Sequence, residues 1–221
     1  MGYRTLLGGG VLNAVFIPSN ADCRELLYQE SLARCRRFCN INNIGEPTFL
    51  KYSEIDQCPN AHVRLFMRKV MGGPTVGSGT GYYHPEDRGY VFVNLPRTAL
   101  PVHRPMKMSW SYPGWKTDRT AYGVPAHEVG HHAEVQLKKM GRLDVRRGEE
   151  WRELIQRVKK QVTSYEPVPS EAWAETIRLF ITNPDLLMRG IPERYGFCLS
   201  VGLKPVELTP WESVINNHQP M

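Results

Sequence analysis

The sequence has few cysteines and no long apolar segment, and both shortages narrow the class of protein. No run of about 18 apolar residues occurs, so we expect no helix that spans a membrane. The cysteine count is five, an odd number without a repeating spacing, which argues against a disulfide framework. We therefore expect free thiols and a reducing compartment such as the cytoplasm. The cysteines are Cys23, Cys35, Cys39, Cys58 and Cys198.

Internal repeats are also absent, and no basic-aromatic motif of a nucleic-acid-binding module stands out. The net charge is +6, but the basic residues are spread along the chain, so we interpret them as a solvated surface. We accordingly expect neither nucleic acid nor a membrane as a partner. Residues 6–17 are a little like a signal peptide, but glycines and Asn13 interrupt them. We predict no signal peptide there, and a strand after a flexible start.

The composition of the chain is that of an ordinary globular domain. Its 221 residues are 41% hydrophobic and 10% aromatic, which suits one domain with its own core. The apolar patterns predict a helix, then strands, then a long loop, then further helices. The expected helices cover residues 19–40, 124–140, 147–162 and 170–182, with short helical pieces from residue 185. The expected strands cover residues 48–52, 61–71, 80–84 and 89–95, the last two as a hairpin, before a loop over residues 100–120.

The stretch His127-Glu128-Val129-Gly130-His131 has the form H-E-x-x-H. On a helix, the two histidines lie on one face, one turn apart, where both rings can bind a single metal ion. Glu128 lies about 100° further round the helix, from which its carboxylate can take a proton from a water on the metal. Pro125 near the start and Gly141 after the end of this stretch both favour a helix.

A catalytic zinc site needs a third protein ligand and one open position for water. The pattern that supplies a third histidine on the same helix fails here, because Glu134 and Leu137 stand where glycine and histidine are required. The alternative is a carboxylate on a second helix, where Glu171 and Glu175 lie one turn apart on one face. Spacing alone leaves open which of the two is the ligand. The opposite face of that helix carries Trp173, Ile177 and Phe180 toward a core.

Two stretches downstream of the motif resemble a known family. Residues 163–165 read Thr-Ser-Tyr, and residues 171–180 read EAWAETIRLF. The same order of H-E-x-x-H, T-S-Y and E-x-x-A-E-x-x-R-L is similar to the catalytic domain of anthrax lethal factor and its relatives, which are zinc endopeptidases of the gluzincin type. The resemblance covers residues 127–180. The spacing from Tyr165 to Glu171 is about one residue shorter than in lethal factor.

The resemblance implies a role for each matching residue. The implied ligands of one zinc ion are His127, His131 and Glu171. Glu128 would be the general base, and Tyr165 would donate a hydrogen bond to the developing oxyanion. Glu175 would orient a ligating imidazole through its other ring nitrogen. We interpret His132 and Glu134 as surface groups or as groups that support the ligands, and we assign nothing to the other histidines, which are His62, His84, His103 and His218.

The implied fold is an α+β, zincin-like metallopeptidase domain over residues 1–221. Its N-terminal lobe, residues 1–122, would hold a small sheet, its C-terminal lobe, residues 123–221, would be helical, and zinc would lie in the cleft between them. A strand at the edge of the cleft would bind a protein or peptide substrate as an added strand. The predicted function is zinc-dependent hydrolysis of peptide bonds.

Two other functions remain open. The same metal chemistry would serve a zinc hydrolase that acts on amides other than peptides. A structural or binding protein on a zincin scaffold, such as a component of a viral particle, could retain the metal for stability alone, with an assembly partner that the sequence does not identify. Glu128 argues against the second alternative, because a purely structural zinc site needs no base.

Overall fold

The computed structural model describes residues 20–72, 80–99 and 118–207. These residues form mixed helix and a small three-stranded sheet, so the predicted α+β class is confirmed at this level. The helices are α1 (Asn20–Ile41), α2 (Ala61–Gly72), α3 (Gly123–Lys139), α4 (Val145–Arg157), α5 (Pro169–Thr182), α6 (Pro184–Gly190) and α7 (Pro192–Ser200). The strands are β1 (Thr48–Lys51), β2 (Gly81–His84) and β3 (Tyr90–Val93), and two 3-10 turns are η1 (Tyr52–Gln57) and η2 (Leu95–Arg97).

The sheet has the order β1-β3-β2, which leaves β2 at one edge. Strands β2 and β3 pair antiparallel, as the predicted hairpin requires, whereas β1 pairs parallel to β3. The hairpin turn uses positive φ angles at Asp87 (55°) and Gly89 (89°), a conformation that glycine and aspartate adopt most readily. One row across the sheet joins Leu50, Phe92 and Tyr82.

Residues 61–71 form helix α2, so the strand predicted there is wrong. The side chain of Asn60 starts the helix by accepting hydrogen bonds from the backbone N–H groups of His62 and Val63, at 2.9 and 3.1 Å. Val63 and Met67, one turn apart, are fully buried, whereas Leu65 is 64% exposed. Over so short a run, the apolar residues fit both the two-residue period of a strand and the 3.6-residue period of a helix. The cap at Asn60 decides for the helix.

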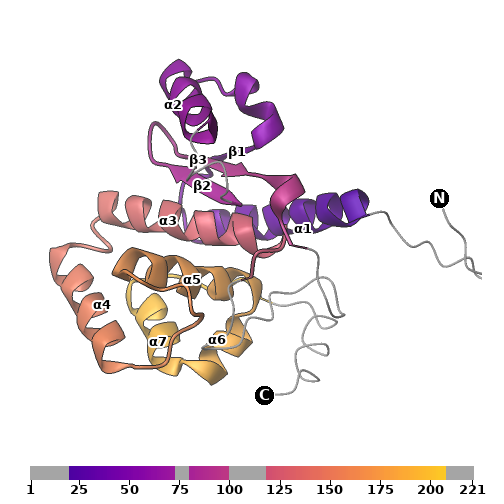
Figure 1. The fold of residues 1–221 in the computed structure, drawn as a ribbon. Helices are drawn as coiled ribbons and strands as arrows, with labels where there is room; N and C mark the ends of the chain where they lie inside the picture. The colour runs from indigo at the N-terminus through magenta and orange to yellow at the C-terminus, as the bar shows by residue number, and fades with distance from the viewer. Residues whose placement is uncertain (1–19, 73–79, 100–117, 208–221) are drawn as a thin grey trace, which may run out of the picture.

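The elements form layers on either side of the sheet (Figure 1). Helix α2 and turn η1 cover one face, where Val63 and Met67 pack with the row of Leu50 and Phe92. Helices α1 and α3 lie on the other face, against the side chains of β3 that alternate with that row. Helix α5 packs along the far side of α3, and α4, α6 and α7 gather around α5. The sheet and α5 therefore meet α3 from opposite sides.

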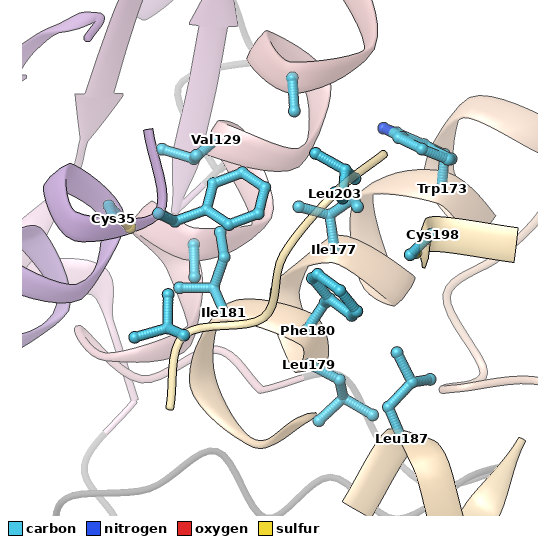
Figure 2. Close-up of a cluster of buried hydrophobic side chains, with 14 of the residues drawn as sticks. Cys35, Val129, Trp173, Ile177, Leu179, Phe180, Ile181, Leu187, Cys198 and Leu203 are labelled. Carbon is cyan, nitrogen blue, oxygen red and sulfur yellow. The ribbon is translucent and has the colours of Figure 1, made fainter. Parts of the chain in front are cut away.

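The main core lies around α5 (Figure 2). Trp173, Ile177 and Phe180 are buried there, as the helical pattern predicts, beside Val129 of α3 and Cys35 of α1. All five cysteines are buried and free, so the expected absence of disulfides holds for each of them. Burial raises the pKa of the Cys35 thiol to about 12. These thiols therefore pack as small apolar groups.

Several predicted boundaries shift by a few residues. The helix expected to reach residue 162 ends at Arg157, although Val162 itself is buried. Helix α5 begins at Pro169, with Val168 at its N-cap in place of the expected Ser170. The short helices expected after residue 185 are α6 and α7. Most of the predicted loop, residues 100–117, and the whole predicted N-terminal strand lie outside the described residues.

No helix within the described ranges is both long enough and apolar enough to cross a membrane. The predicted division into lobes near residue 122 and the likeness to a zincin fold stay predictions.

Candidate metal centre

Helix α3, which carries the H-E-x-x-H motif, has a start fixed by side chains just before it. The hydroxyl of Thr120 accepts hydrogen bonds from the backbone N–H groups of Tyr122 and Gly123, at 3.2 and 3.3 Å. Asp118 in turn accepts hydrogen bonds from the N–H and the hydroxyl of Thr120, at 2.9 and 2.7 Å. A side chain at Gly123 would overlap the carboxyl group of Asp118. These hydrogen bonds fix the residue at which α3 begins, and so fix the direction in which the side chains of the motif point.

The two histidines of the motif and Glu171 of α5 come together at the start of the contact between α3 and α5. Oε2 of Glu171 lies 3.2 Å from Nε2 of His127 and 3.6 Å from Nε2 of His131. All three donor atoms lie within 4.8 Å of one another, and this is the group among the described residues that could hold a metal ion. The side chains are 12%, 20% and 21% exposed for His127, His131 and Glu171, so the group is sheltered but reachable.

The residues present fit a metal ion. Oε2 of Glu171 is a buried oxygen that no hydrogen-bond donor satisfies, and it faces two imidazole nitrogens. Burial alone would raise the pKa of Glu171, but the interactions with His127 and His131 outweigh it and hold the pKa at about 2. Two imidazole nitrogens and one carboxylate oxygen form a donor set that zinc takes in catalytic sites, although the donor set alone does not identify the metal.

Glu175, one turn after Glu171, lies behind His127. Its Oε1 is 2.7 Å from Nδ1 of His127, on the opposite side of the ring from Glu171. Arg178 donates hydrogen bonds to the same carboxylate, from Nη2 at 2.9 Å and from Nε at 3.2 Å, and both side chains are completely buried. Burial would raise the pKa of Glu175, but Arg178 and His127 lower it to about 2. The geometry therefore groups Glu171, and not Glu175, with the candidate donor atoms.

Glu128 is buried against the first residue of the edge strand β2. A Cβ atom at Gly81 would lie 2.5 Å from Oε1 of Glu128, so only glycine leaves room for this carboxylate. Burial raises the pKa of Glu128, and the negative charges of Glu171 and Glu175 act in the same direction, against the effect of the two histidines. A buried carboxylate whose pKa is raised toward neutrality is suited to proton transfer.

Tyr165 lies on the segment between α4 and α5, and its side chain is 43% exposed. Its ring centroid is 6.0 Å from that of His127. Burial and the charges of Glu171 and Glu128 raise the pKa of Tyr165. The phenol therefore lies beside the candidate metal donors and stays protonated at neutral pH.

Glu166 fixes the segment that carries Tyr165 through hydrogen bonds to its backbone and an ion pair with Arg194. One oxygen of Glu166 accepts hydrogen bonds from the backbone N–H groups of Val162 and Thr163, at 2.7 and 3.1 Å. The other oxygen lies 2.9 Å from Nη2 of Arg194, and both side chains of this pair are almost fully buried. The hydroxyl of Thr163 then accepts a hydrogen bond from the N–H of Tyr165 at 3.2 Å. A buried ion pair thus fixes an irregular segment next to the site.

Gly130, inside the motif, lets α3 and α5 approach closely. A Cβ atom there would lie 2.6 Å from Cα of Ala174, and the indole N–H of Trp173 donates a hydrogen bond to the carbonyl of Gly130 at 3.0 Å. This close approach brings Glu171 and Glu175 within reach of the histidines. Gly81, Gly130, Arg178 and Glu166 were not predicted, since their roles arise from contacts between elements. Only the glycine within the motif and the alanine before Glu175 hint at a tight helix pair in the sequence.

His132, next to the motif, has a structural role. The side chain is completely buried: its Nε2 bonds to the carbonyl of Gly45, and its Nδ1 lies 3.3 Å from the hydroxyl of Tyr83. The interpretation of His132 as a surface group is therefore wrong, because it links α3 to β2 and to the loop after α1. Glu134 is partly buried, with its side chain 20% exposed, and it pairs with Lys138. His103 and His218 lie outside the described residues.

Comparisons with known proteins identify no family for the chain, so its function is inferred from the site itself. No family model matches the chain, and neither does any curated protein or any solved structure.

Proposed function

We propose that the chain is a zinc-dependent peptidase whose site is built from α3 and α5. The observation that carries the proposal is the grouping of His127, His131 and Glu171 within 4.8 Å, with Glu128 buried one residue from the first histidine. A purely structural site would need no such carboxylate. The identity of the metal as zinc rests on the donor set and on the resemblance of the motifs to gluzincin peptidases.

The three donors would hold the ion, which when bound would supply a Lewis acid for the scissile carbonyl and lower the pKa of an attacking water. Glu175 would accept a hydrogen bond from Nδ1 of His127 and so present its Nε2 lone pair to the ion. Arg178 would hold the carboxylate of Glu175 in place, since it binds the face that His127 leaves free.

Glu128 would act as the general base. Its carboxylate would take a proton from the attacking water, and the same group would deliver that proton to the nitrogen of the leaving amine. Its raised pKa makes it a stronger base than an exposed glutamate. Tyr165 would donate a hydrogen bond from its phenol to the oxygen of the scissile carbonyl as negative charge develops there.

The substrate would be an extended peptide that adds to the edge of the sheet at β2. Within the described ranges no strand pairs with the outer edge of β2, and Gly81 at its start lies against Glu128. A peptide paired with β2 would run past the general base with its backbone hydrogen bonded to the strand. Peptide strands bound in this way present successive residues to opposite faces of the sheet.

The test is Glu128→Gln, which keeps the shape of the side chain and removes the basic carboxylate. This variant should fold normally, retain zinc and lose at least about 10²-fold in peptidase activity, the low end for lost general acid–base catalysis. The matched control is Glu134→Gln, three residues after the motif on the same helix, where the carboxylate pairs with Lys138 and is not among the candidate donors, so this variant should keep its activity. If the wild-type protein binds zinc and cleaves no peptide in a broad library, the peptidase proposal fails. If Glu128→Gln retains full activity, the assignment of the base fails.

A further inference from the structure

The edge strand β2 has two different faces beside the candidate site. Gly81 and Tyr83 face α3, where the first lies against Glu128 and the second against His132. Tyr82 and His84 point to the opposite face of the sheet, toward Phe66 of α2. The ring centroid of Phe66 is 5.8 Å from that of Tyr82 and 5.0 Å from that of His84. An aromatic group of three side chains, Phe66, Tyr82 and His84, therefore lines this edge.

The aromatic group is the open end of an apolar row that crosses the sheet. Leu50 and Phe92 are buried under α2, and Phe92 of the central strand pairs with Leu50 on one side and with Tyr82 on the other. Phe66, Tyr82 and His84 are each only partly buried, so exposure of this face increases toward the outer edge of β2. An apolar row that is covered at one end and exposed at the other is suited to one more neighbour, because cross-strand aromatic pairs stabilise a sheet.

We infer, on the basis of the proposed function, that this aromatic group binds an aromatic or large apolar side chain of the substrate. A peptide strand paired with β2 would place one residue opposite Tyr82, on the same face of the sheet. Cross-strand neighbours have Cβ atoms about 5 Å apart, which brings that side chain into contact with Tyr82 and Phe66. Since Gly81 lies at Glu128, the recognised residue is within about two positions of the cleaved bond.

The chemical class follows from what the group offers. Phe66 and Tyr82 supply ring faces and edges, which attract aromatic side chains and the methyl groups of leucine and methionine. A charged side chain at that position would lose water without gaining a partner of opposite charge among these three residues, unless His84 were protonated. Burial lowers the pKa of His84 and outweighs the opposing effect of Glu86, whose carboxylate lies 4.0 Å from the ring, so His84 is neutral at pH 7 and adds to the apolar character.

Two measurements test the inference. In the first, the wild-type protein cleaves a peptide library that varies one position at a time, and cleavage should select Phe, Tyr, Trp, Leu or Met at a single position near the cleaved bond. In the second, the Glu128→Gln protein binds the best peptide and the same peptide with alanine at that position. The alanine peptide should bind about 10-fold more weakly, as expected for loss of one large apolar contact.

Phe66→Ala, introduced into the wild-type and Glu128→Gln proteins, should abolish most of this difference. It should weaken binding of the aromatic peptide and leave the alanine peptide unchanged. Leu65→Ala is the control, because Leu65 is the adjacent residue of α2 and is exposed. Phe66→Leu, which keeps apolar volume without the ring, should retain stability and lose the preference for aromatic over aliphatic side chains.

The outcomes separate this inference from the proposed function. Cleavage without preference at any position, or an equal loss for both peptides in Phe66→Ala, would overturn the inference and leave the peptidase standing. Absence of cleavage with zinc bound, together with no binding of any peptide by Glu128→Gln, would overturn both.

Discussion

The two sides of helix α5 differ completely in chemistry. One side carries Trp173, Ile177 and Phe180 into the main core, where they pack against other apolar side chains (Figure 2). The other side carries Glu171, Glu175 and Arg178 toward α3, and the last two are as deeply buried as the core residues. Apolar burial on the first side favours the fold directly. Burial of charges on the second side costs on the order of several kcal/mol per ion, and the attraction within an ion pair offsets only part of this cost.

Stability accounts for the apolar side of α5 but not for the charged side. A buried ion pair is weak evidence for stability, because apolar residues of similar volume often stabilise a protein as well or better. The charges on α5 have a different explanation, since Glu175 contacts Nδ1 of His127 and Glu171 contacts Nε2 of both histidines. We therefore expect changes on the core side to alter stability alone and changes on the charged side to alter metal affinity.

The largest expected effect comes from breaking the buried pair. Glu175→Gln leaves the charge of Arg178 without its carboxylate, so we expect a loss of about 3–5 kcal/mol in the free energy of unfolding. Zinc affinity should also fall, by about 10- to 100-fold, because the carboxylate no longer orients His127. Denaturant unfolding and a competitive chelator titration measure the two quantities.

Adding Arg178→Met to Glu175→Gln separates the two effects. The double variant removes both charges, so it should regain most of the stability and none of the zinc affinity. Recovery of zinc affinity along with stability would mean that Glu175 matters only for folding, and the contrast between the two sides of α5 would be lost.

The next effect concerns Tyr165, whose ring centroid lies 6.0 Å from that of His127. Tyr165→Phe removes only the phenol hydroxyl, so zinc affinity should be unchanged while kcat falls by roughly 10²-fold, the size expected for an oxyanion donor. Steady-state kinetics on the best peptide, with zinc content measured in parallel, gives the result. An unchanged kcat would remove Tyr165 from the mechanism.

Glu166→Gln tests the role of Tyr165 indirectly. Glu166 accepts hydrogen bonds from the backbone just before Tyr165 and does not contact the candidate metal donors. Weakening the pair with Arg194 should lower kcat in the wild-type background by letting Tyr165 move. In the Tyr165→Phe background it should cost nothing further, because residues that act as a unit are not additive. Equal losses in both backgrounds would make Glu166 a residue of general stability.

The smallest effect belongs to the core side. Ile177→Val removes one buried methylene and should cost about 0.5–1.5 kcal/mol of stability, with zinc affinity and kcat unchanged. Thermal unfolding with the same chelator titration checks both. A change in zinc affinity as large as that of Glu175→Gln would show that packing, and not the carboxylate, governs the site.

Much of the site could be predicted from the sequence because helical spacing brings its residues onto shared faces. His127 and His131 are one turn apart on α3, as are Glu171 and Glu175 on α5, and each pair faces the other in the structure. The sequence left the two glutamates as alternatives. Their distinction depends on which imidazole nitrogen each one reaches, and that is set by the approach of helices α3 and α5, which α4 separates in the chain.

The features that were missed have two different physical causes. Residues 61–71 alternate as a strand does, and only the cap by Asn60 and the packing of Val63 and Met67 decide for a helix. Gly81 belongs to the predicted strand over residues 80–84, but the need for glycine at this position shows only when β2 lies against Glu128. The cap by Asn60 is a local contact with residues two and three positions further on, whereas the role of Gly81 depends on a contact between elements far apart in the chain, which no local pattern records.

The most direct test of the central claim is the zinc content of the purified protein after dialysis. We predict about one zinc ion per chain in the wild type, since two imidazoles and one carboxylate suffice for a stable site. His131→Ala should lose most of the metal, whereas Glu134→Ala, which removes a carboxylate that pairs with Lys138 instead of joining the candidate donors, should keep it. A wild-type protein without zinc, or a His131→Ala variant with full occupancy, would contradict the account.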